Sequence, residues 1–419
     1  MIGKYNRGIA LRRSIWLASG LALVGQAPAA ADTRYQVRAS GGLGIENDPF
    51  LVQTDNEDDG GAVLAAELQV EPSLFIEDER TTFRLFANAR LRQFFEDYDT
   101  TGSFALGANG ATRLDERTSL SGGAQFQTSR SAAQEALFFN DQELVTPEPG
   151  ELPEVQFIDP TVTGTRERFT TYGVNAAVSR QLSPRDSASV GIAFNESHTS
   201  GAFARDYRAA DLTLGYGRQL NERTTLRGTV GVTKSDFVGR EAGDAISVTP
   251  LVGVQQQISE RLNWSAQVGL SFTSITNPFG EDQSATTLAL AVSGCRRDLR
   301  GSLCIAAQRQ PRPTTFDGLS NSTAVNVSYN TALSRRDSIG LNASYRASDR
   351  LTTDPALGTP VEGSDQFIGV GANFRRAFTD DLSGFARGSY SRILWDDLNE
   401  REANVAVYIG LSYVFGNRR

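Results

Sequence analysis

Apolar and polar residues alternate along most of the chain. In WSAQVGLSF, residues 264–272, every second residue is apolar, and the residues between them are serine, glutamine or glycine. The stretches 211–217, 226–232 and 325–330 show the same alternation. Successive side chains of a strand point to opposite faces. A period of two therefore predicts strands that each carry one apolar face and one polar face.

A second pattern recurs on a longer scale, as in QLNERTTLRGTVGV at 219–232: an apolar residue, a short polar cluster, then an alternating run. Eight clusters begin at Glu77, Asp115, Ser183, Asn221, Ser259, Arg296, Ser334 and Thr379. Their spacings are 38, 68, 38, 38, 37, 38 and 45 residues. A fixed repeat of this length predicts one hairpin per unit, with the polar cluster as its tight turn.

Longer connections separate the predicted hairpins, and the 68-residue spacing contains the longest of them. Nine are expected, near 47–62, 94–102, 131–167, 198–206, 236–244, 274–283, 309–322, 349–364 and 395–402. Eight turns and nine loops make 17 connections, hence about 18 strands, with 16 as the alternative. Short turns on one side and long loops on the other are typical of outer-membrane barrels.

The two faces of these strands predict their surroundings. The apolar face is nearly continuous, whereas the opposite face carries glycine, serine, threonine, asparagine, glutamine and arginine. A β-sandwich, a propeller or a solenoid would also alternate. Runs of about 9–13 residues match tilted membrane-crossing strands. We therefore expect an all-β fold: one closed antiparallel transmembrane β-barrel with short periplasmic turns, longer external loops, lipid outside and a wet lumen.

The first 31 residues have the pattern of a secretory signal peptide. Lys4, Arg7, Arg12 and Arg13 precede a short apolar run, and small residues at 29–31 offer a cleavage site. A retained membrane anchor is the alternative, although the apolar run is short for a span. We expect residues 1–31 to be cleaved and 32–419 to form a single barrel domain in the bacterial outer membrane. Cleavage would take the net charge from −8 to −12, which argues against nucleic acid as a partner.

Alternation also predicts which polar side chains face the lumen. A charge on the lipid face near the bilayer centre costs roughly 2–4 kcal/mol, so strand arginines belong inside. The expected pore-lining residues are Arg84, Asn88, Arg90, Arg92, Arg227, Gln267, Asn326 and Asn342. These groups could form a basic conduit wall, or they could pair with carboxylates and simply brace the barrel.

The long segment 131–167 is acidic and proline-rich. It is the third external connection. In classical porins the third external loop folds into the pore, where its acidic residues face a basic wall. We expect it either to constrict the lumen or to remain a solvated surface loop. The candidate constriction residues are Glu135, Asp141, Glu143, Glu148, Glu151, Glu154 and Asp159.

Few residues are suited to catalysis or metal binding. His198 is the only histidine and falls in an expected external loop, and no catalytic triad, metal-spaced cluster or phosphate-binding glycine motif is found. We therefore predict no catalytic residues, no metal site, no cofactor and no enzymatic activity. Cys295 and Cys304 flank one turn cluster with the parity of the lumen face, which predicts a disulfide that clips an enlarged turn; two free thiols are the alternative.

The last strand, VAVYIGLSYVFGNRR, ends on an aromatic residue, Phe415. It resembles the C-terminal strand that the barrel-assembly machinery recognises, although four residues follow Phe415. This strand, the segment GGLGIENDPF and the overall pattern resemble a family of outer-membrane porins that are often associated with exopolysaccharide or capsule gene clusters.

The resemblance implies a porin or channel in contact with outer-membrane lipid and lipopolysaccharide. It also implies a conduit for exopolysaccharide that works with periplasmic polysaccharide-export proteins. A plugged structural barrel, or a receptor or adhesin without transport activity, is the alternative.

Overall fold

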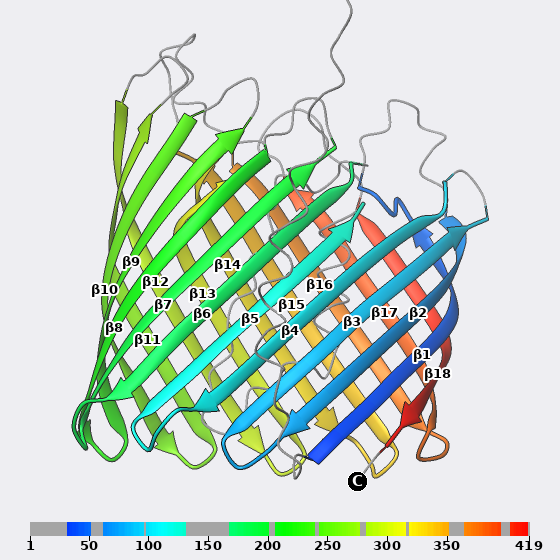
Figure 1. The fold of residues 1–419 in the computed structure, drawn as a ribbon. Coiled ribbons are helices and arrows are strands. Elements are labelled where there is room, and N and C mark those ends of the chain that lie inside the picture. The colour runs from blue at the N-terminus through cyan, green and yellow to red at the C-terminus, as the bar shows by residue number, and fades with distance from the viewer. Residues whose placement is uncertain are drawn as a thin grey trace, which may run out of the picture.

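The computed structural model is a closed β-barrel of 18 antiparallel strands (Figure 1). The structure describes residues 32–51, 62–95, 98–130, 167–200, 206–238, 243–276, 282–315, 318–351, 364–394 and 403–417. In this part of the chain no helix is long and apolar enough to cross a membrane. The expected signal peptide, residues 1–31, lies outside the described residues.

The strands are long and follow one another in the sequence order. The first nine are β1 (Asp32–Asn47), β2 (Ala62–Glu77), β3 (Thr81–Phe94), β4 (Thr101–Arg113), β5 (Thr118–Ser129), β6 (Phe169–Gln181), β7 (Asp186–Thr199), β8 (Asp206–Asn221) and β9 (Thr224–Val238). The others are β10 (Gly243–Ser259), β11 (Leu262–Thr276), β12 (Asp282–Asp298), β13 (Gly301–Thr314), β14 (Gly318–Ala332), β15 (Asp337–Arg350), β16 (Ser364–Ala377), β17 (Leu382–Leu394) and β18 (Asn404–Gly416).

Each strand pairs with its neighbours in the chain, and β1 pairs with β18 to close the sheet. Closure removes the free sheet edges that lipid would not tolerate. Strand β18 ends where the barrel carries the short turns, and the strand ends that lead into the longer connections lie at the opposite end (Figure 1). The predicted fold class is confirmed, and the strand count is 18 rather than 16.

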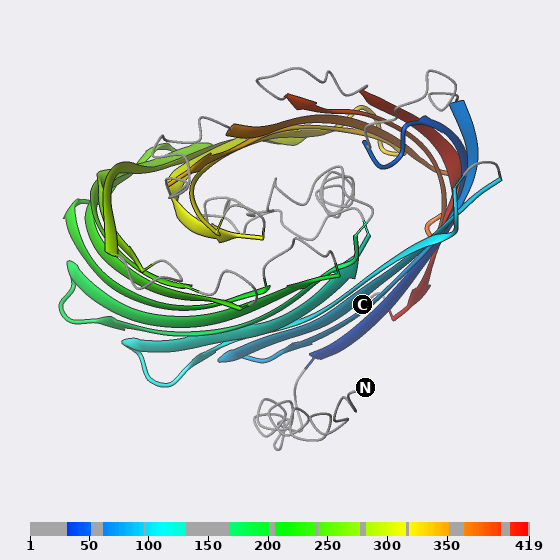
Figure 2. The same ribbon diagram turned by 90° about the horizontal axis from the view of Figure 1, so that it is seen from above.

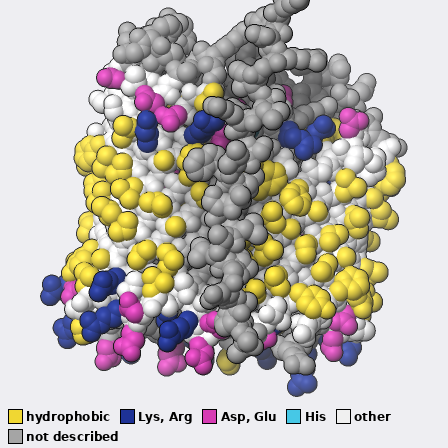
Figure 3. Space-filling model, viewed as in Figure 1, with side chains coloured by type: hydrophobic (Ala, Val, Ile, Leu, Met, Phe, Trp, Pro, Cys, Tyr) yellow, Lys and Arg dark blue, Asp and Glu magenta, His cyan; other side chains and the backbone are white. Residues whose placement is uncertain are grey.

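A belt of apolar side chains surrounds the outside of the barrel. Exposed residues alternate along the strands, as Val268, Leu270 and Phe272 do on β11 and Val405, Val407 and Ile409 do on β18. Apolar side chains occupy the middle of the visible face, and many charged side chains gather at the end with the short turns (Figure 3). A closed barrel with an apolar belt is built to span a bilayer, and such single-chain barrels occur in the bacterial outer membrane.

The recurring polar clusters form the short turns, and their first polar side chain fixes the backbone. The Ser183 hydroxyl accepts hydrogen bonds from the N–H groups of Arg185 and Asp186, at 3.1 and 3.0 Å. Asp115 accepts from the Arg117 N–H at 2.7 Å, and this bond holds the pKa of Asp115 below its ordinary value. Side chains that bond to the backbone two or three residues on favour turns. The repeat is thus a structural device at the periplasmic end.

Two expectations about the external connections are wrong. His198 lies in strand β7, opposite Thr170 of β6, rather than in a loop. Most of the expected loop 309–322 is also strand, because β13 continues to Thr314 and β14 begins at Gly318. Pro311 and Pro313 suggest a loop, since proline interrupts a ladder, but proline is tolerated at a strand edge.

The edge that carries these prolines is indeed unpaired. The ladder between β12 and β13 ends at Leu290 and Arg309, although β13 stays paired with β14 as far as Thr314. The Leu351 N–H donates to the Leu319 carbonyl, so Leu319 directs its backbone groups toward β15 and away from its partner Pro313. The backbone nitrogens of Pro313 and Pro311 therefore point to the side of β13 on which β12 is no longer paired. No hydrogen-bond donor is needed on that side, so proline is tolerated there.

Beyond this point the β13–β14 hairpin turns into the barrel (Figure 2). Leu319 packs in a buried apolar cluster with Tyr207, Phe237, Ala245 and Ile275, which lie on β8, β9, β10 and β11. Strand β13 also contacts β8, which is five strands away in the sheet order. The inward hairpin narrows the barrel on one side at the end with the longer connections.

Candidate functional site on the inner wall

The alternation of the ladder places the expected pore-lining residues on the inner face. In β3 the outward residues Leu85 and Leu91 are 38% and 50% exposed, whereas Asn88, Arg90 and Arg92 between and beside them are buried. The same parity places the remaining expected residues inside: Arg84, Arg227, Gln267, Asn326 and Asn342. Their role in lining a pore stays a prediction.

The structure brings the β3 arginines together around Glu67 of β2. Arg387 Nη1 of β17 lies 3.2 Å from Glu67 Oε1. The Nε atoms of Arg90 and Arg92 lie 3.7 and 3.8 Å from Glu67 Oε2. The side chain of Glu67 is only 4% exposed. Since a buried carboxylate is costly unless it is paired, these three guanidinium groups keep Glu67 charged inside the wall.

A second layer extends this network toward the periplasmic end. Glu71 accepts hydrogen bonds from Gln69 and Asn88, at 2.6 and 3.1 Å, and Arg38 lies 3.7 Å from its other oxygen. Arg84 lies farther along β3 on the same face, and its contacts are aromatic. Its guanidinium carbon lies 4.9 and 5.3 Å from the ring centroids of Phe75 and Phe86. Such cation–π contacts hold a guanidinium without removing its charge.

The closure seam between β1 and β18 adds a third layer. Tyr408 of β18 donates its hydroxyl hydrogen to Glu46 of β1, and both side chains are 1% exposed. Arg92 Nη1 lies 3.4 Å from the same Glu46. Gly44 leaves the space that the Tyr408 ring occupies, because a Cβ at this position would overlap the ring. The seam is therefore connected through Arg92 to the inner-face arginines described above, which we call the arginine wall: Arg38, Arg84, Arg90, Arg92 and Arg387.

The chain after β1 bends over this network on the inside. Phe50 packs against Phe94 and Tyr98, with ring centroids 6.0 and 5.5 Å apart. Leu51 is 1% exposed and contacts Phe367 of β16 and Ile393 of β17. Leu51 has a φ of 53°, a left-handed conformation that is rare for leucine and needs support from its surroundings. Burial of Leu51 supplies this support.

The wall as a whole carries more basic than acidic side chains. Five arginines face three glutamates: Arg38, Arg84, Arg90, Arg92 and Arg387 against Glu46, Glu67 and Glu71. Sequence reasoning identified the β3 arginines but not their carboxylate partners or Arg387, because strand parity gives the face of a residue but not its neighbours across the ladder. The 320-residue separation of Arg387 from Glu67 shows how non-local the network is.

The expected constriction residues of segment 131–167 fall on 131–166, which lies outside the described residues, so that expectation stays a prediction. The part of the lumen that the structure does describe is narrowed by the β13–β14 hairpin. The sequence signal that could have indicated this hairpin is the pair of prolines two residues apart, which marks one edge of a strand as unpaired.

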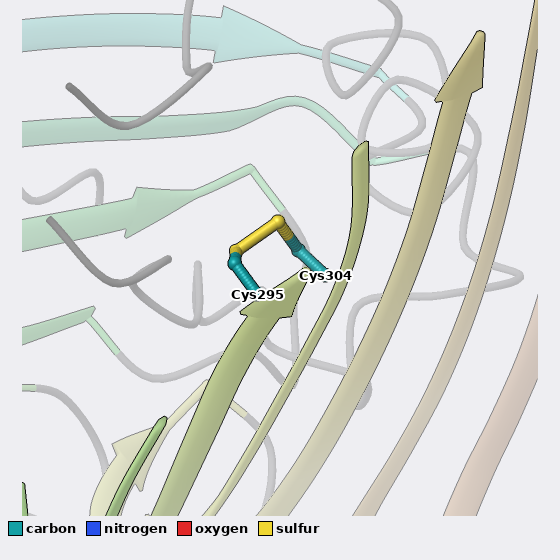
Figure 4. Close-up of a disulfide and its surroundings, with 2 residues drawn as sticks. All are labelled: Cys295 and Cys304. Atoms are coloured by element: carbon teal, nitrogen blue, oxygen red, sulfur yellow. A yellow bond between two sulfur atoms is a disulfide. The ribbon is translucent and has the colours of Figure 1, made fainter. Parts of the chain in front are cut away.

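Cys295 and Cys304 lie opposite one another on β12 and β13 and form a disulfide (Figure 4). Their side chains are buried, at 1% and 6% exposure. The turn below them is not enlarged, because only Leu299 and Arg300 separate the two strands. The disulfide lies below the point where β12 and β13 part, so it fixes the paired half of this hairpin.

We expect replacement of both cysteines by serine to lower the free energy of unfolding by about 2–3 kcal/mol, because a cross-link restricts the unfolded chain. Urea unfolding of the refolded barrel measures this change. Intact mass spectrometry with and without reductant provides the control. An unchanged mass after reduction would mean that the thiols are free and would contradict the bridge.

His198 lies near the end of β7, where its ring contacts two carboxylates. Its Nδ1 is 2.8 Å from Asp206 and its Nε2 is 3.0 Å from Glu196, and Arg208 is 3.0 Å from the same glutamate. No group of three or more histidine, cysteine or acidic side chains in the described ranges is arranged to hold a metal ion. These contacts are those of a surface ion-pair network.

Comparisons with known proteins show similarity to solved outer-membrane structures. No family model and no curated protein matches the sequence. The FrpB iron transporter of Neisseria meningitidis aligns over 92% of this chain and 83% of its own, with 8% identity and a TM-score of 0.46. OccK2 of Pseudomonas aeruginosa, solved with glucuronate, aligns over 92% and 99%, with 10% identity and a TM-score of 0.43.

OccAB3 of Acinetobacter baumannii aligns over 92% of this chain and all of its own, with 10% identity and a TM-score of 0.39. At such identities and scores these likenesses carry no argument about cargo. This chain is an 18-stranded outer-membrane β-barrel, as shown by its closed sheet, its apolar belt and its asymmetric connections.

Proposed function

We propose that the barrel is a transport channel that prefers anionic solutes. The observation that carries this proposal is the arginine wall, in which Arg38, Arg84, Arg90, Arg92 and Arg387 lie on the inner faces of β1, β3 and β17. Fixed positive charge along a low-dielectric wall raises the local concentration of anions. An 18-strand barrel is wide enough to enclose an aqueous path.

A finer proposal is that the cargo is an anionic exopolysaccharide, delivered by periplasmic polysaccharide-export proteins. The segment GGLGIENDPF supports it through the family resemblance. This segment provides Glu46, which contacts Arg92 of the arginine wall, and Phe50, which packs in the apolar cluster beside it. We also propose that the final strand, now β18, is the element that the barrel-assembly machinery recognises, and that the outer belt contacts lipid and lipopolysaccharide.

Single-channel recording with arginine variants tests the anion preference. We expect the double substitution Arg38→Gln and Arg84→Gln to lower the chloride-to-potassium permeability ratio by about twofold, because two wall charges are removed. Arg34→Gln is the matched control, since Arg34 lies at the exposed start of β1 and pairs with Glu77. An equal effect of both changes would contradict a role for the wall.

The polymer proposal needs a different probe. A polyuronate added on the periplasmic side should interrupt the current, whereas a neutral dextran of similar length should interrupt it much less. Equal interruption by both polymers would argue against an anionic polysaccharide. Some charges of the arginine wall are paired with carboxylates, as around Glu67. Such pairing favours the alternative, a structural barrel without transport activity. A folded barrel without any channel current would support that alternative.

A further inference from the structure

One further arginine on the inner face, Arg346, lies away from the arginine wall, and its surroundings differ. Arg346 of β15 is 3% exposed. Its ladder neighbours are Ala324 of β14 and Phe367 of β16, which are 3% and 2% exposed. Neither neighbouring side chain can accept a hydrogen bond, so the two ladder partners of Arg346 provide no acceptor for its guanidinium.

Arg346 differs from Arg38, Arg90, Arg92 and Arg387, each of which lies within 4 Å of a glutamate. Within the described ranges it has no ion-pair partner, and its buried Nη1 has no hydrogen-bond acceptor. By contrast, Glu67 alone contacts Arg90, Arg92 and Arg387. A buried charge without a partner is costly, and proteins keep such groups where a ligand of opposite charge completes the site.

Two hydroxyl groups on the same face also lack partners. Ser348 follows Arg346 by two residues on β15 and lies opposite Ser322 of β14. Their exposures are 0% and 3%, and the Oγ atom of each is buried without a hydrogen-bond partner among the described residues. Paired positions on neighbouring strands place side chains roughly 5 Å apart, which lets both hydroxyls donate to one group.

The surroundings of this set are fixed by two features already described. Phe367, beside Arg346, is covered by Leu51 from the segment after β1. Ser322 lies on the part of β14 that turns inward with β13, since its partner Gln310 is beyond the end of the β12 ladder. The set therefore lies at the base of the inward hairpin, on the side of the barrel that is narrowed.

From these contacts we propose that Arg346, Ser322 and Ser348 form a binding site for an oxyanion, a carboxylate or phosphate group carried by a solute in the lumen. The guanidinium provides the charge and the two hydroxyls donate hydrogen bonds to the anion oxygens. The inference rests on the proposed anion channel and places one specific binding site in its lumen. The cargo would thus be a solute that carries a discrete acidic group.

Calorimetric titration of the full-length barrel in detergent tests this site without any need for conduction. The probes are sodium acetate and inorganic phosphate, each against sodium chloride of equal ionic strength. We expect saturable binding of at least one probe, and the R346Q variant should bind it at least about tenfold more weakly, since a charged hydrogen bond is worth about that factor. The probe that binds identifies the class of acid.

The control is R309Q, because Arg309 lies on β13, two strands from Arg346 in the sheet, and is paired with Asp349 at 3.0 Å; its binding should equal that of the wild type. If R346Q does not fold, the double variant S322A/S348A keeps the charge and should weaken binding about threefold. Binding that is unchanged in these variants, or absent for both probes, overturns the site. A barrel that binds through Arg346 but carries no current would refute only the channel function.

Discussion

The E67Q variant is expected to lose about 3–5 kcal/mol of its free energy of unfolding, because removal of one partner from a buried ion pair leaves the other charge uncompensated. Three guanidinium groups lie within 3.8 Å of the Glu67 carboxylate, and the side chain is almost completely buried. A neutral amide of the same size keeps the packing but not the charge. Urea unfolding of the refolded barrel in detergent, followed by intrinsic fluorescence, measures the loss.

E77Q is the matched control for this prediction. Glu77 pairs with Arg34 at 2.7 Å, a shorter distance than any around Glu67, but the two side chains are 56% and 41% exposed. An exposed pair contributes at most about 1 kcal/mol, so E77Q should unfold almost as the wild type does. Equal losses in the two variants would mean that burial does not set the strength of the wall network.

The G44A variant is expected to lose up to about 3 kcal/mol of its free energy of unfolding, because an added methyl group in a filled space forces its neighbours apart. The seam between β1 and β18 should also close less efficiently. The methyl group would overlap the ring of Tyr408 and the carbonyl oxygen of Val407. Tyr408 cannot move aside freely, since its hydroxyl is bound to Glu46. The heat-modifiable folded fraction on a gel and urea unfolding both report this loss.

G41A provides the comparison at the same seam. Gly41 also lies on β1, but a Cβ there would meet only the Glu67 carbonyl oxygen, at 3.8 Å, which is an ordinary contact. Its folded fraction should match the wild type. If G44A folded equally well, the interlocking of Gly44 and Tyr408 would not contribute to closure.

Much of the fold could be predicted from the sequence, because it depends on local patterns. Alternation defined the strands, and the spacing of polar clusters such as those at Ser183 and Ser334 defined the turns, whose hydroxyls bond to the adjacent backbone. Parity placed Arg90 and Arg92 inside, since a charge facing lipid would be costly. These local patterns do not depend on contacts between distant strands.

The parts that could not be predicted depend on contacts between distant strands. Glu67 meets Arg387 across the closure seam, and nothing in the local sequence of either residue indicates the other. The inward hairpin was missed because Pro311 and Pro313 resemble a loop until the free edge of β13 is seen. The oxyanion site was missed because Arg346 was not distinguished from other strand arginines by any spacing or motif.

The arginine wall and the site around Arg346 have different consequences for transport. Carboxylates partly compensate the wall, so it provides a general positive field and mechanical stability at the seam. Arg346 lies beside two buried apolar ladder partners and near two hydroxyls that have no partner among the described residues, which favours contact with one acid group at a time. A channel with both would admit anions broadly and delay those that carry a carboxylate or phosphate.

The reversal potential of the purified wild-type barrel in a planar bilayer, measured across a KCl gradient, shows whether the barrel is an anion channel. We expect stable single-channel currents whose reversal potential shows chloride to be more permeant than potassium, because fixed positive charge lines the wall. Preference for potassium, or a correctly folded barrel that carries no current, would contradict the claim that this barrel is an anion channel.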